Sequence, residues 1–333
     1  MTNTNLIVQK YGGATLSTPE KIKNIAKKIC EAKKSNQNIV AIVSAMGETT
    51  NQLLALAKQV SNNPSPRELD MLLSVGERTS MALLTMALND LNCEAISFTG
   101  SQAGILTDDS HIDANIIDVK AFRVSEALQK NKVVILAGFQ GVSPVTKEIT
   151  TLGRGGSDTT AVAMAAHLNA NHCEILKDVD SIFTADPKIV PYAKPIQKLN
   201  YEQLLEMTTL GAKFLHYKSA AMAKEKNVKL YVGPAEKNNS SGSWISQEHM
   251  SAENKPLAIN SSSSISNSEN ENFCNVSLTM TKNITDEIKN SVLHLLKNAN
   301  IEIHKQTITA MSFEVMISKA EKNKALIQLH QLI

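Results

Sequence analysis

Short apolar runs alternate with amphipathic helical patterns through the first two thirds of this 333-residue chain, and this alternation restricts the possible folds more than any other feature. The runs interpreted as strands are residues 6–8, 39–43, 95–98 and 133–137. A continuous apolar run such as 39–43 is typical of a strand buried on both faces of a parallel sheet. Strands that alternate with helices form βαβ units, which bind ligands at the carboxyl ends of the strands. The pattern therefore predicts an α/β protein with its functional groups at that edge.

The charge balance and the apolar pattern argue against several classes of protein. The chain has 34 Lys+Arg against 32 Asp+Glu, a net charge of +2, which provides no electrostatic basis for binding nucleic acid or an anionic membrane. The longest nearly apolar run, 81–88, is shorter than the roughly 20 residues that span a bilayer. No secretory signal is visible, and the four cysteines are too far apart for a zinc site. We therefore expect a soluble cytoplasmic enzyme with reduced thiols.

A lysine and two glycines follow the first predicted strand. Lys10, Gly12 and Gly13 stand between that strand and a helical pattern with a capping sequence. Glycines let the backbone approach a phosphate closely, and the next helix offers free N–H groups and the positive end of its dipole. A lysine at this point can neutralise phosphoryl oxygens during transfer. The alternative is an ordinary turn with a surface lysine, and the Walker pattern GxxxxGK[ST] is absent.

The segment 152–160, with the sequence LGRGGSDTT, is the most informative motif. Three glycines surround Arg154, and Ser157 and Asp158 stand at the start of the helical pattern that follows. An arginine can bind a carboxylate through two parallel hydrogen bonds, which a lysine cannot do. The motif thus predicts an anion site with an acidic side chain set into it. The alternative is a glycine-rich turn in which Ser157 or Asp158 only caps the helix.

Three further segments carry polar side chains where a substrate or nucleotide could bind. Ser44 and Thr50 lie just past the predicted strand 39–43, and Glu77 could receive the ammonium group of a substrate. The acidic segment 177–188 follows another strand and could contact a nucleotide. Each has a simpler interpretation as well: helix capping for Ser44 and Thr50, a solvated helix face for Glu77, and a solvated turn for 177–188.

The C-terminal third differs from the rest in composition. Residues 246–272 include a stretch rich in serine and asparagine and low in complexity, which predicts a linker. The segment 273–333 then shows a β-α-β-β-α order, which indicates a small α+β regulatory module that lacks a final strand. We therefore divide the chain into a domain over 1–245, the linker and this module.

Together these motifs resemble those of aspartate kinases, within the amino acid kinase family. The resemblance covers nearly all of residues 5–245 in order, and its glycine-rich string is highly specific. The matching stretches are VQKYGG at 8–13, VSAMGETT at 43–50, RELDMLLSVGE at 67–77, SFTGSQAGILT at 97–107, AGFQG at 137–141, TTLGRGGSDTTAVA at 150–163, DVDSIFTADPKIV at 178–190 and LGAKFLH at 210–216. The segment 273–333 resembles an ACT module, the family's usual site of feedback by lysine or threonine.

The resemblance implies a three-layer α/β/α sandwich with a mainly parallel sheet, followed by a ferredoxin-like ACT module. It implies transfer of the ATP γ-phosphate to the β-carboxylate of L-aspartate, the first step toward lysine and diaminopimelate, threonine and methionine. By matching position Lys10 and Asp158 are catalytic, with Lys10 stabilising the transferring phosphoryl group and Asp158 organising that lysine. The residues implied to bind aspartate are Ser44, Thr50, Glu77, Arg154 and Ser157.

The resemblance also implies a nucleotide site. Its residues are Lys10, Tyr11, Gly12, Gly13, Lys177, Asp178, Phe183, Lys188 and Lys213. Mg²⁺ is implied as well, held largely by ATP itself, so we expect no protein ligand for a metal. No general base is required, because the attacking carboxylate is already ionised at pH 7.

The chain departs from the family pattern in ways that keep alternatives open. Ala14 replaces a hydroxyl residue, and Lys177 stands where threonine or serine is usual. Most members carry two ACT modules, whereas this chain has about one. Three hypotheses follow: an active aspartate kinase, a kinase for another carboxylate such as N-acetylglutamate, and a non-catalytic regulatory subunit that binds amino acids. We expect a homodimer formed through the ACT-like module, with lysine or threonine as candidate effectors.

Overall fold

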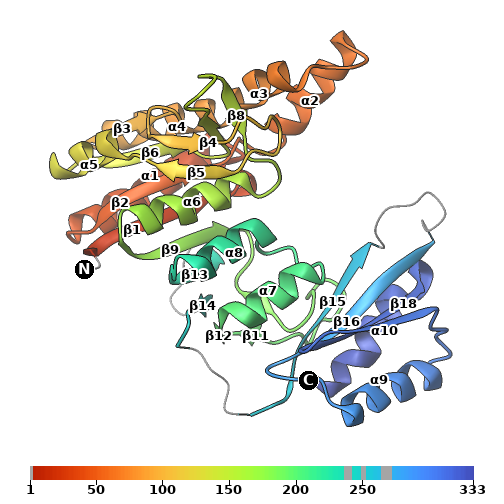
Figure 1. Cartoon of the computed structure of the whole chain (residues 1–333). Coiled ribbons are helices and arrows are strands. Elements are labelled where there is room, and N and C mark those ends of the chain that lie inside the picture. Colours follow the sequence, from red (N-terminus) through yellow and green to blue (C-terminus); the bar gives the residue numbers. More distant parts are fainter. Residues whose placement is uncertain (1–2, 236–241, 249–252, 264–271) are drawn as a thin grey trace. The chain divides into compact units, whose positions relative to one another are not determined.

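The chain forms two compact units in the computed structural model, which describes residues 3–235, 242–248, 253–263 and 272–333 (Figure 1). The first unit contains residues 1–180 and 221–241, and the second contains 181–220 and 242–333. This division differs from the predicted boundary at 245, because Ala185 and Val190 pack into the apolar core of the C-terminal part. No helix in the described ranges is long and apolar enough to cross a membrane.

The first unit is built on a parallel sheet in which the strands follow the order β13-β9-β1-β2-β6-β3. Its strands are β1 (Asn3–Tyr11), β2 (Asn38–Val43), β3 (Ala95–Phe98), β6 (Val133–Ala137), β9 (Ala170–Lys177) and β13 (Leu230–Pro234). The central strands β2 and β6 are buried along almost their whole length, as continuous apolar runs require. The four strands expected from the sequence are all present.

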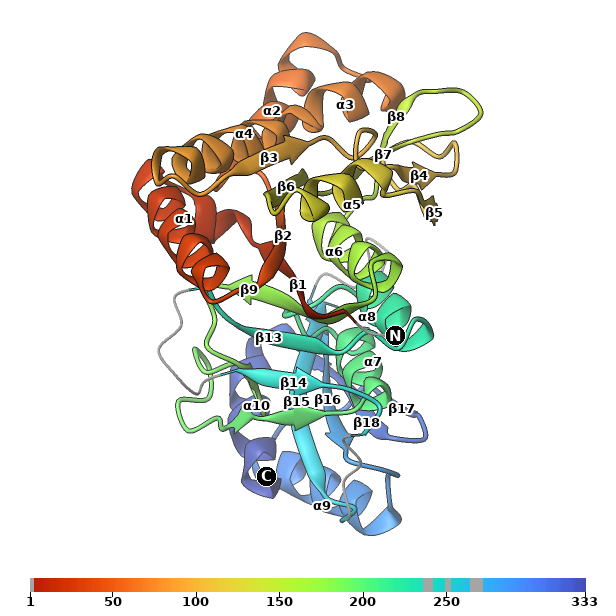
Figure 2. The same cartoon turned by 90° about the vertical axis from the view of Figure 1, so that its left-hand side faces the viewer.

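Helices cover both faces of this sheet (Figure 2). On one face α1 (Pro19–Lys34) packs against α4 (Val75–Asp90), and on the other α6 (Gly156–His167) lies over β1 and β9. The remaining helices of this part are η1 (Gly13–Leu16), α2 (Thr49–Val60), α3 (Pro66–Leu73), α5 (Phe122–Gln129) and α8 (Tyr217–Glu225), the last of which continues from the second unit. The predicted α/β/α sandwich with a mainly parallel sheet is confirmed.

A small second sheet in the first unit has the order β5-β4-β7-β8. Its strands are β4 (Ile105–Thr107), β5 (Ile116–Val119), β7 (Gln140–Val142) and β8 (Ile149–Thr151). β4 and β5 are joined by the segment 108–115, and β8 leads directly into the glycine-rich segment 152–156. This sheet therefore fixes the approach of that segment to α6.

The second unit contains a four-stranded antiparallel sheet in the order β15-β16-β18-β17. Its elements are β15 (Pro256–Ser263), β16 (Phe273–Met280), α9 (Asp286–Asn298), β17 (Lys305–Ile308), β18 (Ser312–Ser318), η2 (Lys319–Glu321), α10 (Lys322–Leu329) and η3 (His330–Leu332). The apolar side chains of β16 and β18 alternate and pack with those of α9 and α10 in one buried core. The unit also contains β10 (Ile182–Phe183), β11 (Pro195–Ile196), β12 (Lys198–Leu199), α7 (Tyr201–Thr209) and β14 (Ser243–Ile245).

β15 lies inside the segment that the sequence predicts as a linker, and over 256–263 this prediction is wrong. Ala258 and Ile259 are buried, and the serines that follow pair with β16, opposite Val276 at Ser261. Backbone hydrogen bonds to a neighbouring strand can hold an edge strand in place even when its side chains are polar. No strand follows α10 in the described residues, as the sequence predicts, and β15 from the preceding segment occupies the edge of the sheet beside β16. Residues 249–252 and 264–271 of the predicted linker lie outside the described residues.

We predict that Ile259→Ala destabilises the second unit by about 2–5 kcal/mol, the usual cost of truncating a buried isoleucine. Ile259 is 1% exposed, whereas Ile308 on the same sheet is 51% exposed and supplies the matched control. Ile308→Ala should cost less than about 0.5 kcal/mol. Urea unfolding followed by the fluorescence of Trp244, the single tryptophan, measures both. Equal effects of the two variants would show that β15 is not part of the packed sheet.

Candidate active site

Two loops meet at the carboxyl ends of β1 and β2. A Cβ atom added to Gly13 would lie 2.8 Å from the carbonyl oxygen of Ala45, so a side chain does not fit there. The Gly47 N–H donates to Gly13 O over 3.0 Å, and the Ser44 N–H donates to Tyr11 O over 3.1 Å. The glycine pair therefore sets how closely the loop after Lys10 approaches the loop that begins at Ser44.

A buried carboxylate lies between two lysines at this edge of the sheet. Lys10 Nζ is 2.7 Å from Asp158 Oδ1, and Lys177 Nζ is 3.4 Å from Asp158 Oδ2. Lys10 and Asp158 are 6% and 4% exposed, so water screens their attraction weakly. Burial by itself would raise the pKa of Asp158, but Lys10 and Lys177 hold that pKa below its usual value. With both lysines protonated, the three groups have one excess positive charge for an anionic ligand.

The N-terminus of α6 adds further groups to this centre. Ser157 and Asp158 are in its first turn, and the glycine-rich segment before them contains Gly153 and Gly155 with φ of +68° and +73°. Glycine adopts this left-handed conformation without the steric cost that other residues pay. Arg154 between them is exposed and has no ion pair or hydrogen bond to any residue that the structure describes. Its guanidinium is therefore available to a ligand.

Glu77 combines burial with an unsatisfied oxygen. It lies in the first turn of α4 and is 4% exposed, so the interpretation as a solvated helix-face carboxylate is wrong. Its Oε1 accepts from the Ala45 N–H over 3.1 Å, while Oε2 has no partner among the described residues. Burial raises the pKa of Glu77 to about 7 against the opposing effects of the Ala45 N–H and Lys10. A buried acceptor without a partner favours binding of a donor, above all a cationic one.

The other predicted substrate and nucleotide residues of the first unit take varied positions. Ser44 and Thr50 are half-buried at the end of β2 and the start of α2. Tyr11 is buried, and its hydroxyl donates to Gln9 Oε1 over 3.1 Å, so its side chain is part of the core. Lys177, the last residue of β9, is half-buried, and Asp178, the next residue, is exposed.

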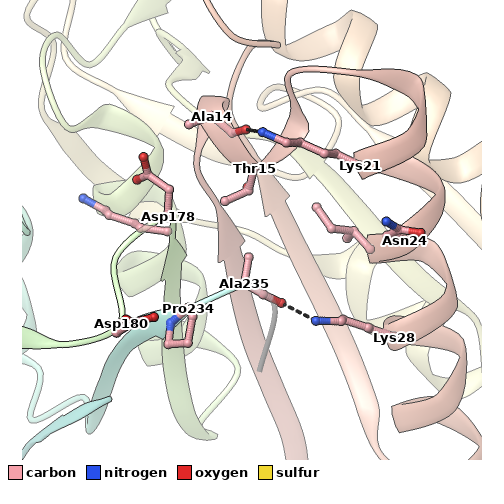
Figure 3. Close-up of a pocket in the computed structure, with 11 residues that line it drawn as sticks. Ala14, Thr15, Lys21, Asn24, Lys28, Asp178, Asp180, Pro234 and Ala235 are labelled. Atoms are coloured by element: carbon pink, nitrogen blue, oxygen red, sulfur yellow. Dashed lines mark hydrogen bonds between the residues drawn. The ribbon is translucent and has the colours of Figure 1, made fainter. Parts of the chain in front are cut away.

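Lys177 and Asp178 line a cavity of about 410 Å³ beside Thr15 (Figure 3). Lys21 and Lys28 of α1 stand on one side of it, with their ammonium groups donating to the carbonyl oxygens of Ala14 and Ala235, over 2.9 and 3.0 Å respectively. Asp178 and Asp180 stand on the other side. The cavity is thus polar and of mixed charge, and it opens next to the two glycines.

Three predicted nucleotide residues belong to the second unit. Phe183 is half-buried at the end of β10, whereas Lys188 and Lys213 are exposed. Their predicted role stays a prediction.

The sequence did not predict the pairing of Lys177 with Asp158, nor the burial of another carboxylate, Asp70. Asp70 stands in the quoted stretch RELD, but its hydrogen-bond partners are His111, Ile112 and Thr151. No local pattern links positions 41 and 81 residues apart. For Lys177, its place at the end of a strand beside β1 was a usable signal.

Comparisons with known proteins support a common origin for the first two thirds of the chain. A model described as "Amino acid kinase family" matches residues 5–234. The aspartokinase of Corynebacterium glutamicum is 53% identical over 227 residues, which are 68% of this chain and 54% of that protein. The chain thus spans about half the length of the curated relatives it matches.

Two solved structures extend the likeness over nearly the whole chain. Aspartate kinase from Synechocystis superposes on 98% of this chain and 69% of its own, with a TM-score of 0.66 and 27% identity. Aspartokinase III of E. coli in complex with aspartate and ADP covers 98% of this chain and 84% of its own, with a TM-score of 0.68. At 23% identity this second likeness shows a shared fold.

We predict that the stability of the wild type falls relative to Glu77→Gln as the pH rises. The folded-state pKa of Glu77 is raised from 4.5 to about 7, so the folded protein binds this proton more tightly than the unfolded chain. The contribution of the Glu77 proton to the free energy of unfolding is fully present below pH 4.5 and is lost as the pH rises through about 7. The total loss is about 3 kcal/mol. Urea unfolding by circular dichroism at pH 5, 6, 7 and 8 tests it, and a pH-independent difference would contradict it.

Proposed function

The chain belongs to the amino acid kinase family, and from this premise we propose that it transfers the γ-phosphoryl group of ATP to the β-carboxylate of L-aspartate. The observation that carries the proposal is the buried Asp158 between Lys10 and Lys177, at the carboxyl edge of a parallel sheet. Relatives that are about 50% identical over this part are aspartokinases. The product would be 4-phospho-L-aspartate, which enters the cytoplasmic synthesis of lysine and diaminopimelate, threonine and methionine.

The three charged groups of aspartate match three sets of side chains. Arg154 binds the α-carboxylate through two hydrogen bonds, and Glu77 Oε2 accepts from the α-ammonium group. Hydroxyl groups of Ser44, Thr50 and Ser157 donate to the carboxylates. This division leaves one oxygen of the β-carboxylate free to react.

The reaction needs positioning and charge compensation more than proton transfer. A β-carboxylate oxygen attacks the γ-phosphorus, the bond from that phosphorus to the β,γ-bridging oxygen breaks, and ADP leaves with the electron pair. Lys10 donates to the γ-phosphoryl oxygens as charge moves to the leaving group, and Lys177 compensates charge from the next strand. Asp158 holds both ammonium groups in place. The backbone at Gly12 and Gly13 lets the phosphates approach.

The nucleotide would bring its own metal ion. No group of three or more His, Cys, Asp or Glu side chains in the described ranges could hold a metal ion. Phosphate oxygens of ATP would supply most of the ligands of Mg²⁺, and the bound ion would supply positive charge to the phosphates. Tyr11 through its backbone and Asp178 would contact the rest of the nucleotide, and the role of Phe183, Lys188 and Lys213 of the second unit stays a prediction.

A single observation separates aspartate from an N-acylated substrate such as N-acetylglutamate. The buried Glu77 Oε2 lacks a partner among the described residues, and an ammonium group satisfies it with charge as well as with a hydrogen bond. An acetylated nitrogen has one neutral N–H group and cannot compensate the carboxylate in the same way. Glu77 therefore favours a free amino acid.

The experiment that tests the function is ATP- and Mg²⁺-dependent formation of an acyl phosphate, trapped as its hydroxamate. L-Aspartate should react, whereas N-acetylglutamate and N-acetylaspartate should not. Binding of ATP by the folded protein without turnover of L-aspartate would contradict the proposal and support a regulatory subunit.

We further propose that the four-stranded sheet with α9 and α10 is an ACT-like module that binds lysine or threonine and forms a homodimer. Its edge strand β17 is exposed over all four residues and pairs with β18 alone among the described strands. An open edge strand is a ready site for pairing with a second chain.

Light scattering should therefore show a dimer that dissociates on dilution, and Thr307→Pro in β17 should shift the equilibrium toward monomer, because proline removes a backbone donor. The exposed Lys305→Ala serves as the control and should leave the dimer intact. A wild-type monomer at every concentration would overturn this proposal.

Arg154→Ala should raise the aspartate KM and lower kcat/KM by about 10²-fold, or about 2.7 kcal/mol, while the KM for ATP changes little. Arg154→Lys keeps the charge but loses the paired hydrogen bonds, so it should recover only part of the affinity. Steady-state kinetics with each substrate varied in turn measures both. An unchanged aspartate KM in Arg154→Ala would remove this residue from the substrate site.

A further inference from the structure

A fully buried carboxylate supports the segment that carries Arg154. Asp70 in α3 is 0% exposed. Thr151 Oγ1 donates to Asp70 Oδ1 over 2.5 Å, and His111 Nδ1 lies 2.7 Å from Asp70 Oδ2. The Ile112 N–H also donates to this carboxylate, at 3.1 Å from Oδ1. Both oxygens are thus used, so Asp70 offers no free acceptor to a substrate and acts on its protein neighbours.

One of these neighbours is held in an unfavourable conformation. Ile112 has φ of +72°, and β-branched residues rarely adopt the left-handed region. Such a conformation is strained and persists only where surrounding contacts impose it. Here the Ile112 N–H donates a hydrogen bond to the carboxylate of Asp70, and the Ala114 N–H donates to the backbone carbonyl oxygen of Thr151 over 2.9 Å. The segment 111–114 is therefore held on both sides of its strained residue.

The held segment packs directly against the glycine before Arg154. A Cβ atom added to Gly153 would lie 2.5 Å from Asp113 Oδ1 and 3.1 Å from Ile112 O, so the contact leaves no room for a side chain. Thr151, which Asp70 also bonds, is only two residues before Gly153. Asp70 consequently holds the segment that carries Arg154 in two ways. It bonds Thr151 at the start of that segment, and it bonds Ile112, whose neighbourhood packs against Gly153.

The same carboxylate is close in sequence to the helix that carries Glu77. The Ser74 N–H donates to the backbone carbonyl oxygen of Asp70 at the end of α3. Gln140 Nε2 donates to the backbone carbonyl oxygen of Ser74 over 2.9 Å. α4 begins at the next residue and holds Glu77 in its first turn. Asp70 thereby connects the element that carries Glu77 to the segment that carries Arg154.

We propose that Asp70 is a positioning residue that sets the place of Arg154 relative to Glu77. It would thereby determine how tightly the site binds the α-carboxylate and α-ammonium groups of a free amino acid. The inference rests on the proposed function, because that function assigns these two groups to Arg154 and Glu77. Its physical basis is the set of bonds to Thr151, His111 and Ile112 and the contact at Gly153.

The test uses the full chain with Asp70→Asn, which keeps the shape of the side chain and removes its charge and one acceptor. The aspartate KM should rise about tenfold or more while the KM for ATP stays within about twofold, since a displacement of about 1 Å can cost up to about 10²-fold. Asp118→Asn, at an exposed carboxylate on β5, is the matched control and should match the wild type.

Amide hydrogen exchange gives a second measurement that needs no substrate. In Asp70→Asn, exchange should become faster at Ile112 and also at Gly156 and Thr159, whose N–H groups bond Gly153 O and Gly155 O. If Asp70→Asn does not fold, Thr151→Val and Thr151→Ser replace it. The first loses the hydroxyl that bonds Asp70 and should raise the aspartate KM, while the second keeps the hydroxyl and should restore it.

The outcomes separate this inference from the proposed function. Faster exchange confined to 111–114, or a lower kcat with an unchanged aspartate KM, would overturn the positioning role. If the wild type does not phosphorylate L-aspartate, the proposed function fails. Exchange at Gly156 and Thr159 then decides the positioning role alone: unchanged exchange there overturns it, and faster exchange supports it.

Discussion

The pairing of Asp158 with Lys10 and Lys177 is the interaction on which the first unit depends. A buried ammonium or carboxylate group is costly unless an opposite charge lies within reach. The parallel sheet meets this requirement, because β1 and β9 are neighbours with Tyr11 opposite Leu176, so both strands deliver their lysines to the same edge. The carboxylate comes from the first turn of α6, which lies over these strands. Removing Asp158 would leave two neighbouring ammonium groups without their counter-charge, whereas removing one lysine would leave a neutral ion pair.

Asp70, Asp158 and Glu77, three of the buried carboxylates in this unit, differ in how their oxygens are satisfied, and the difference indicates what each does. Asp70 has protein partners on both oxygens and holds backbone. Asp158 is paired with two cations, so it organises charge. Glu77 has one oxygen satisfied and one without a partner in the described residues, so it is suited to a ligand. Burial raises the pKa of Glu77 to about 7, whereas the two lysines keep that of Asp158 low despite its burial.

Much of the fold could be predicted from the sequence, because the βαβ pattern is local and strongly periodic. The glycine motifs, which are equally local, also indicate the residues around Arg154 and Lys10. β15 could not be predicted in this way, since Ser261 and its neighbours are ordered by pairing with β16 and not by their own preference. The environment of Asp70 was equally hidden, because its partners come from a different part of the chain and no spacing rule connects them.

The claim that Asp158 and its two lysines form a phosphoryl-transfer centre is tested most directly by single-turnover transfer of labelled γ-phosphate from ATP to L-aspartate. ATP binding must be measured in parallel, in the wild type and in Asp158→Asn. The account predicts that both proteins bind ATP and that Asp158→Asn transfers phosphate at least about 10²-fold more slowly, a loss of about 2.7 kcal/mol of transition-state stabilisation. Transfer by Asp158→Asn at the wild-type rate would contradict it.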